Sequence, residues 1–164
     1  MVLRQIAAAL FAGAALVSMH ASALADDAGL TVHAGSEVKL SAADLGKLAA
    51  VIIRTMPEHR SEGEYTCASA AAVLGAAGVE LGKSLRGKRM AEYLLVKAAD
   101  GYEVVFALPE LDPDFTDRQV LLCYAKDGAL LGADEGPLRM VVPGEKRQAR
   151  WVRQVTDFFV GKRQ

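Results

Sequence analysis

The residues best suited to chemistry in this chain are cations grouped around a glycine-containing loop near its C-terminal end. They are Arg139, in a Gly-Pro-Leu-Arg segment, and Lys146, Arg147 and Arg150, which follow a Pro-Gly pair. Backbone N–H groups in such loops can hold an anion together with neighbouring cations. We therefore predict that these four residues bind an anion. The alternative is that they are solvated charges that balance the acidic loop over residues 109–117, because charged surface loops are common.

A second basic cluster occupies a glycine-punctuated loop over residues 82–89. Its members are Lys83, Arg86, Lys88 and Arg89. The same two interpretations apply to it, an anion site that uses backbone N–H groups or a set of solvated loop charges.

Thiol chemistry has weaker support. The only cysteines, Cys67 and Cys123, stand in apolar surroundings, whereas a reactive thiol needs an electropositive and partly open setting. We expect both to be buried, with Cys67 at the start of a helix. We favour unpaired thiols, because two buried cysteines need not lie at bonding distance. A disulfide and a thiol-redox role are the alternatives.

Metal chemistry is also poorly supported. After residue 25 the only histidines are His33 and His59, which are far apart in sequence. Neither a Cys-x-x-Cys nor a His-Glu-x-x-His spacing is present, although such spacings are typical of zinc sites. We therefore predict no metal site and expect His59 to face solvent in a polar loop.

The elements that must position these residues begin with two short strands, over residues 30–33 and 37–40. Ser41 is a candidate N-cap for a short helix, with Asp44 placed to complete a capping box. The apolar run over residues 51–53 predicts a buried strand. Thr66 or Ser69 is expected to cap a second helix that stops at Gly78.

The second half of the chain is richer in strands. Asp100-Gly101 between two apolar runs predicts a hairpin over residues 93–98 and 102–108. Residues 109–117 are expected to form a loop or one helical turn. Further strands are expected over residues 119–125, 138–142 and 150–160. Strands with two short helices indicate an α+β fold that is mainly β.

The N-terminal residues follow the plan of a secretory signal peptide. Arg4 precedes an apolar run over residues 6–17, and Ala23-Leu24-Ala25 offers small side chains for cleavage. We predict a signal peptide over residues 1–25, a single domain over residues 26–164, a periplasmic location and no membrane insertion after cleavage. A formal net charge of −1 excludes a general nucleic-acid binder.

Several motifs of the second half resemble one known family. They are Ala99-Asp100-Gly101-Tyr102 followed by Val104-Val105-Phe106, then Glu110-Leu111-Asp112, then Gly136-Pro137-Leu138-Arg139-Met140-Val141-Val142-Pro143, and last Arg150-Trp151-Val152. In this order they are similar to the oxidoreductase molybdopterin-binding domain, which has the sulfite-oxidase-like fold. The segment over residues 65–74 matches a weaker element of the family. The resemblance implies an α+β, mainly β fold of that type.

The resemblance also implies a molybdenum cofactor in the enzymes of the family, whose last basic loop helps to bind the anionic parts of the cofactor. Arg139, Lys146 and Arg150 match that neighbourhood by position. Three features depart from the enzymes. Residues 51–56 lack the cysteine that would bind the metal through its thiolate, and Cys67 falls at the wrong place. The signal has no twin arginines, and the chain is short for loops that enclose a pterin.

These departures lead us to expect a cofactor-free binding or structural module for a small anion or a periplasmic protein partner. The alternative is a genuine molybdopterin-dependent oxidoreductase that acts on a small oxyanion. Whether the protein is an enzyme is left open, as are its ligand, its partner and its oligomeric state, because a fold alone does not define an activity.

Overall fold

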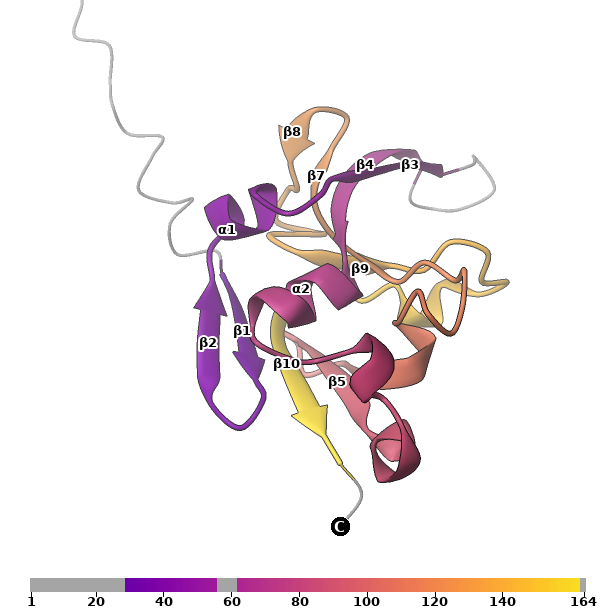
Figure 1. The fold of residues 1–164 in the computed structure, drawn as a ribbon. Helices are drawn as coiled ribbons and strands as arrows, with labels where there is room; N and C mark the ends of the chain where they lie inside the picture. Colours follow the sequence, from indigo (N-terminus) through magenta and orange to yellow (C-terminus); the bar gives the residue numbers. More distant parts are fainter. Residues whose placement is uncertain (1–28, 56–61, 163–164) are drawn as a thin grey trace, which may run out of the picture.

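A computed structural model of the chain describes residues 29–55 and 62–162 (Figure 1). The predicted signal peptide and most of the predicted polar loop that contains His59 lie outside the described residues. Within them the fold is mainly β with a few short helices, which confirms the predicted α+β, mainly β class. None of the described helices is long and apolar enough to cross a membrane.

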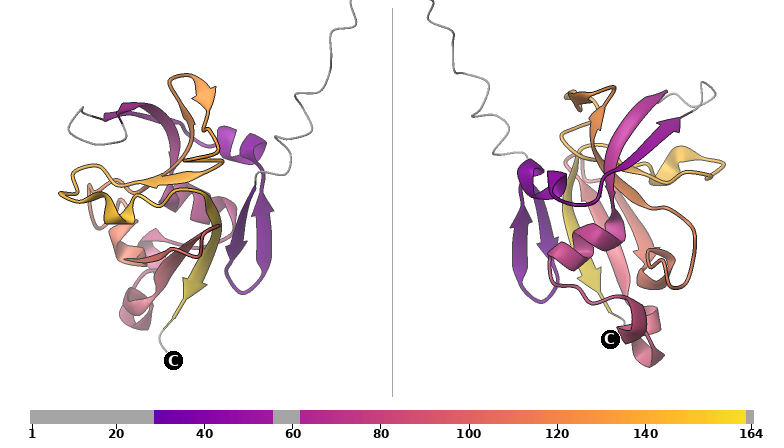
Figure 2. Two further views of the ribbon diagram at one scale, coloured as in Figure 1. Left: turned by 180° about the vertical axis from the view of Figure 1, so that it is seen from behind. Right: turned by 45° about the horizontal axis from the view of Figure 1, so that its top comes forward.

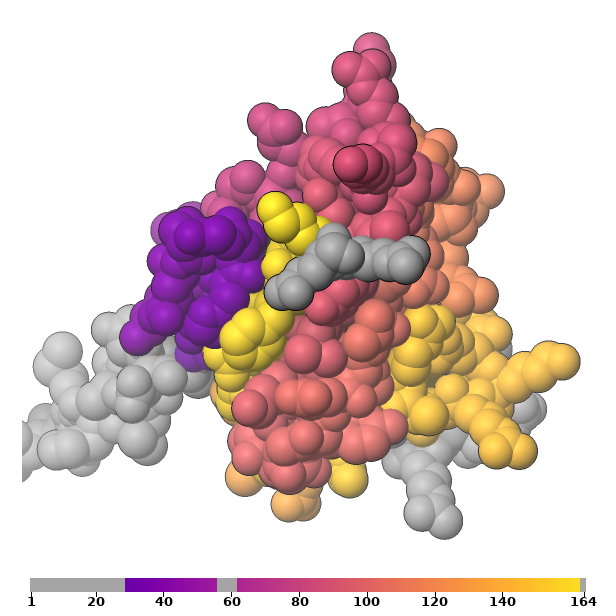
Figure 3. All heavy atoms as spheres, turned by 90° about the horizontal axis from the view of Figure 1, so that it is seen from below, coloured from indigo at the N-terminus to yellow at the C-terminus, as the bar shows by residue number. Residues whose placement is uncertain are grey.

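One sheet joins the two ends of the described chain. Its strands, in spatial order, are β2 (Glu37–Leu40), β1 (Leu30–His33), β10 (Val155–Gly161), β5 (Tyr93–Ala98) and β6 (Glu103–Ala107). The β1–β10 pair is parallel and the other pairs are antiparallel. In Figure 3 the N-terminal hairpin, in indigo, lies beside the yellow C-terminal strand. The strands predicted over residues 30–33, 37–40 and 93–98 are confirmed.

The second sheet carries both cysteines and the first predicted anion-binding residue. Its strands are β3 (Val51–Thr55), β4 (Gly63–Ser69), β7 (Leu121–Lys126) and β8 (Ala129–Leu130), and β9 (Arg139–Val141) pairs with β7. All of these pairs are antiparallel. Figures 1 and 2 show this sheet at one end of the first.

The burial predicted for β3 is wrong. The run of apolar residues does form a strand, but β3 lies at the edge of the second sheet, and Ile52 is 63% exposed. An apolar run cannot by itself distinguish an edge strand from a central one, because both satisfy the same local preferences.

Two short α-helices connect the sheets. α1 (Ala42–Gly46) begins at Ser41, whose hydroxyl and backbone N–H form the predicted capping box with Asp44. α2 (Ala70–Ala76) is capped by Ser69, so the second of the two predicted caps is the correct one. Single turns of 3₁₀ helix complete the chain: η1 (Gly82–Ser84), η2 (Gly87–Ala91), η3 (Leu108–Glu110) and η4 (Gln148–Arg150).

The last strand begins later than predicted. Residues 148–150 form η4, and β10 starts only at Val155. Gln154 has a φ of +52°, a left-handed conformation that interrupts an extended chain. The turn before β10 directs Trp151 inward, where it is 6% exposed and its indole N–H donates to Val142 O at 3.0 Å.

The core lies between the two sheets and α2. Phe106 and Phe158 from the first sheet, Tyr65 from the second and Leu74 from α2 are fully buried. Cys67 lies in β4 and not at the start of a helix, as was predicted, because β4 continues to Ser69 before α2 begins. The site residues therefore sit on strands and turns that one common core holds in place.

Candidate functional site

Arg139, the first predicted anion-binding residue, lies on β9 and points into the protein. Its side chain is only 4% exposed. One guanidinium nitrogen lies 2.9 Å from Oε2 of Glu135 and donates to the Tyr65 hydroxyl at 3.2 Å. The Tyr65 hydroxyl in turn donates to Glu135 Oε2 at 2.9 Å. Arg139 therefore already binds an anion, and that anion is a carboxylate of the chain itself.

Lys126, at the end of β7, joins the same cluster. Its Nζ lies 3.6 Å from Glu135 Oε1 and 5.2 Å from the centre of the Tyr65 ring. The Arg139 guanidinium lies 5.6 Å from the same ring and 5.8 Å from the ring of Trp151. Two cations and a phenol thus meet at one carboxylate, an arrangement that offsets the cost of burying Arg139.

The cluster perturbs the acidity of two groups. Burial raises the pKa of Tyr65, and the carboxylate of Glu135 raises it further against the opposing charge of Arg139. Burial would also raise the pKa of Glu135, but the hydrogen bond and charge of Arg139, with help from Tyr65 and Lys126, outweigh it. The pKa of Glu135 therefore lies below its ordinary value.

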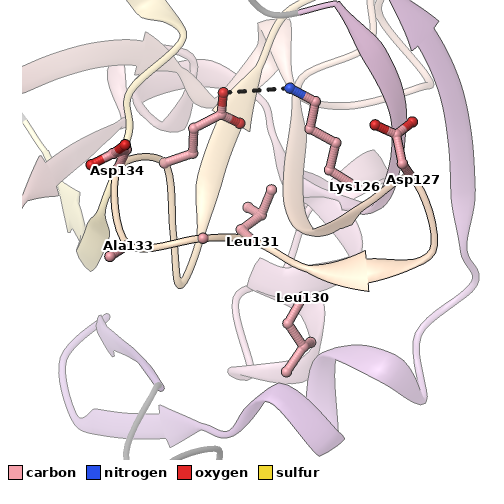
Figure 4. Close-up of a pocket in the computed structure, with 8 residues that line it drawn as sticks. Lys126, Asp127, Leu130, Leu131, Ala133 and Asp134 are labelled. Carbon is pink, nitrogen blue, oxygen red and sulfur yellow. Dashed lines mark ion pairs between the residues drawn. The ribbon is translucent and has the colours of Figure 1, made fainter.

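A pocket of about 390 Å³ opens beside this cluster (Figure 4). Its lining includes both members of the Lys126–Glu135 ion pair, the apolar side chains of Leu130 and Leu131, and the carboxylates of Asp127 and Asp134. Figure 4 shows Asp134 on one side and Lys126 with Asp127 on the other, with Leu131 between them. The pocket thus combines one cation with the apolar side chain of Leu131 and several carboxylates.

Arg150 is held by a different pair of carboxylates. Its Nε donates to Glu145 Oε1 at 2.8 Å, Nη2 contacts the same oxygen, and Nη1 lies 3.3 Å from Glu110 Oε1. Its guanidinium lies 4.5 Å from the centre of the Phe106 ring. Burial would lower the pKa of Arg150, but Glu145 and Glu110 raise it above its ordinary value, so the guanidinium stays charged.

Lys146 and Arg147 differ from the two arginines in their exposure. Both are exposed, and neither forms an ion pair with a residue that the structure describes. The golden segment that carries them projects from the molecule in Figures 2 and 3. The structure therefore divides the four predicted anion-binding residues. Arg139 belongs to a buried cluster and Arg150 to a half-buried one, and only Lys146 and Arg147 are exposed to solvent.

The second basic cluster is also divided. Arg89 lies 3.0 Å from Glu92 and donates to the Ser84 hydroxyl at 2.6 Å and to Glu80 O at 2.9 Å. These contacts tie together the turns of η1 and η2. Arg86 and Lys88 are exposed. Arg89 is thus a structural residue, and the exposed members keep the interpretation of solvated loop charges.

The expectation of unpaired thiols is wrong, because Cys67 and Cys123 form a disulfide. The two residues are register partners in the β4–β7 pair, and both are fully buried. The sequence places them 56 residues apart and gives no sign of this register. A thiol-redox role gains no support from this arrangement, because neither sulfur is exposed to a partner.

His33 also has a structural setting. Its Nε2 lies 2.9 Å from Asp157 Oδ1, and its ring stacks on Phe159 with the centroids 4.2 Å apart. These contacts join β1 to β10. Among the described residues, no three His, Cys, Asp or Glu side chains gather in a way that could hold a metal ion.

Sequence reasoning missed three members of the buried cluster, namely Tyr65, Lys126 and Glu135. The one available signal was the spacing of Glu135 and Arg139, which are opposite charges four residues apart. That spacing implies a contact on a helix, but residues 135–139 are not helical. The turn instead depends on Gly136, where a Cβ would lie 2.7 Å from Leu131 O.

A comparison with protein families gives a match. The family model described as the oxidoreductase molybdopterin binding domain matches residues 52–163. The matched region contains both cysteines, the buried cluster and the exposed basic loop. A search of curated proteins found no match.

Proposed function

Because the chain belongs to the oxidoreductase molybdopterin-binding domain family, we propose that it is an exported, cofactor-free member that binds an anion. The ligand is a small anion or an acidic group of a periplasmic protein partner, and the exposed loop with Lys146 and Arg147 receives it. The bond between Cys67 and Cys123 is the observation that carries the cofactor-free part of the proposal.

The donor atoms of this chain do not fit a molybdenum centre of the family type. Such a centre uses a cysteine thiolate, a soft ligand that suits the metal. The chain has only two cysteines, and each is bonded to the other inside the second sheet. No thiolate remains for a metal ion while this bond is intact. The residues of this chain therefore do not fit a molybdenum centre, because they supply no thiolate donor.

The arginines of the predicted anion site give a second argument. An arginine that binds the anionic parts of a cofactor must be able to offer its guanidinium to them. Here Arg139 is paired with Glu135, and Arg150 is paired with Glu145 and Glu110. Each guanidinium is therefore neutralised by the chain itself, which supports a module that works without the cofactor.

A molybdopterin-dependent oxidoreductase acting on a small oxyanion is the second candidate. The length of the family match favours it, because residues 52–163 include the whole ordered set of motifs. It would require a metal site without a cysteine thiolate. A content measurement distinguishes the two candidates directly.

The experiment is to purify the mature protein from a host that makes the cofactor and to measure molybdenum by mass spectrometry and pterin by fluorescence. A molybdenum enzyme of the same family, expressed in the same host, is the positive control. We expect neither molybdenum nor pterin in the protein. Stoichiometric amounts of both would contradict the proposal and establish the second candidate.

Export to an oxidising compartment is part of the same proposal. Disulfides persist in compartments such as the periplasm and are rare in the cytosol. The Cys67–Cys123 bond supports this location, together with the signal-like residues 1–25. Cell fractionation with N-terminal sequencing is the test, and we expect a periplasmic protein that begins at Asp26. A full-length protein in the cytosol would contradict it.

A further inference from the structure

The buried cluster has the properties of a carboxylate-binding site. Its three binding groups come from three strands of the second sheet: Tyr65 from β4, Lys126 from β7 and Arg139 from β9. The carboxylate that they hold comes from Glu135, which lies in the turn between β8 and β9. The groups that bind are therefore anchored in the sheet, whereas the bound carboxylate is carried by a residue of a turn.

The backbone of that turn is held independently of the Glu135 side chain. Gln154 N–H donates to Glu135 O at 2.9 Å, and the Gln154 side-chain amide donates to Ala133 O at 2.7 Å. The turn also closes on itself, since the N–H groups of Glu135 and Gly136 both donate to Gly132 O. Rotation of the Glu135 side chain can thus empty the cluster without moving the main chain.

A pocket lies beside the Lys126–Glu135 ion pair, which is the part of the cluster that it reaches, since Tyr65 and Arg139 are not among its lining residues. The pocket of about 390 Å³ is lined by both Lys126 and Glu135, so a molecule inside it meets the outer ion pair of the cluster first. That pair, at 3.6 Å, is longer than the 2.9 Å pair between Glu135 and Arg139. The Lys126 side chain is 26% exposed and the Glu135 side chain is 23% exposed, so solvent can reach this pair.

The lining of the pocket selects among anions. Leu131 points toward the ion pair in Figure 4 and offers an apolar surface to a short aliphatic chain, whereas Leu130 points away from the pair and is 65% exposed. Asp127 and Asp134 also line the pocket, and their negative charges oppose the entry of any anion, a ligand with two carboxylates more strongly than a ligand with one. We propose that Tyr65, Lys126 and Arg139 form a binding site for a small aliphatic monocarboxylate, which Glu135 fills in the free protein and leaves when the carboxylate of the ligand enters from the pocket.

This site is separate from the loop with Lys146 and Arg147, and it goes beyond the function proposed above. It needs neither molybdenum nor a partner protein. Its test therefore succeeds or fails independently of a measurement of cofactor content.

The test is a titration with potassium acetate and potassium propionate, with potassium chloride at equal ionic strength as the reference. Binding is followed by thermal shift and by amide NMR of the strands that carry the site. The first variant is Glu135→Ala, which removes the internal carboxylate. The second is Glu135→Gln, which removes the charge but keeps the size of the side chain, and it can be tested even if the alanine variant does not fold. Glu103→Ala is the control, since Glu103 is an exposed carboxylate on β6, far along the chain from this turn.

We expect weak, saturable binding of propionate to the wild type and to Glu103→Ala. Binding to Glu135→Ala or Glu135→Gln should be at least about tenfold tighter, because the ligand no longer competes with an internal carboxylate for Arg139 and Lys126. Adding Lys126→Ala to either variant should remove the gain. A wild type that binds no propionate would overturn the proposal, and so would Glu135 variants that bind it no more tightly than the wild type.

Discussion

Cys67 on β4 and Cys123 on β7 are register partners in the second sheet, and a disulfide joins them. This disulfide bears both on the stability of the domain and on which side chains remain available as ligands. It fixes the strands that carry Tyr65 and Lys126, and it consumes both thiols of the chain. Neither thiol is therefore available as a metal ligand, and both sulfurs belong to the framework that supports the buried cluster.

Removing the disulfide should destabilise the protein by about 2–4 kcal/mol. The bond joins residues 56 apart, and the entropy of closing such a loop corresponds to about 4 kcal/mol when the native state is unstrained. The variant is Cys67→Ala with Cys123→Ala, and urea unfolding measures its free energy. Wild-type protein unfolded with a reductant is the control. Equal stability of the variant and the oxidised wild type would show that the bond contributes nothing.

Glu135→Gln should lower the stability by about 1–3 kcal/mol at neutral pH, because it leaves the buried Arg139 charge without its carboxylate. The loss should depend on pH. The folded pKa of Glu135 lies below its ordinary value, so its contribution is fully present above the pKa of an unfolded glutamate and is lost as the pH falls through the folded pKa. The wild type and the variant should therefore converge in acid.

Urea unfolding of both proteins at a series of acidic pH values measures this convergence. Glu103→Ala is again the control, since it removes an exposed carboxylate on β6 for which no such loss is expected. A difference between wild type and Glu135→Gln that stays constant down to strongly acidic pH would contradict the assignment of this linkage to Glu135.

The phenol of Tyr65 should report the state of the cluster. Burial and the neighbouring carboxylate of Glu135 raise its pKa, whereas Arg139 opposes the rise. Glu135→Gln should therefore lower the pKa of Tyr65, because the negative charge is gone and Arg139 remains. NMR of tyrosine labelled with carbon-13 at Cζ follows the titration. An unchanged or higher Tyr65 pKa in the variant would contradict the proposed cluster.

Local chemistry explains which parts of the fold the sequence could predict. The Ser41–Asp44 capping box and the Asp100-Gly101 turn depend on residues close together in the chain, and both are confirmed. The disulfide and the position of β3 depend on register between distant strands. A fully buried Cys67 and an exposed Ile52 come from similar apolar runs, and only the sheet order separates them.

The candidate site follows the same division. The sequence identifies Arg139 and Arg150 as cations in a glycine-containing region, but it does not show where their charges are neutralised. Glu110 contacts Arg150 although the two residues are 40 positions apart in sequence, and Tyr65 contacts Arg139 although they are 74 positions apart. A cation that binds a ligand and a cation that binds its own chain have the same local sequence, so contacts of this range decide between them.

Lys146 and Arg147 should be the residues of the basic loop whose loss affects binding without affecting the fold. Both are exposed, and substitution of exposed residues without specific contacts changes stability by about 0.5 kcal/mol or less. Lys146→Ala with Arg147→Ala should weaken the binding of sulfate and of a short poly-glutamate peptide several-fold. Isothermal titration calorimetry measures both ligands.

Arg150→Ala is the contrasting variant. Its loss leaves Glu145 and Glu110 without their shared cation, so we expect a stability loss of about 1–3 kcal/mol in urea unfolding. Glu145→Ala tests the same logic in the opposite direction, because it frees part of the Arg150 guanidinium and should strengthen sulfate binding. If the Lys146→Ala, Arg147→Ala protein binds sulfate and the poly-glutamate peptide as tightly as the wild type does, the loop is not the anion-binding surface. Its cations are then only solvated surface charges.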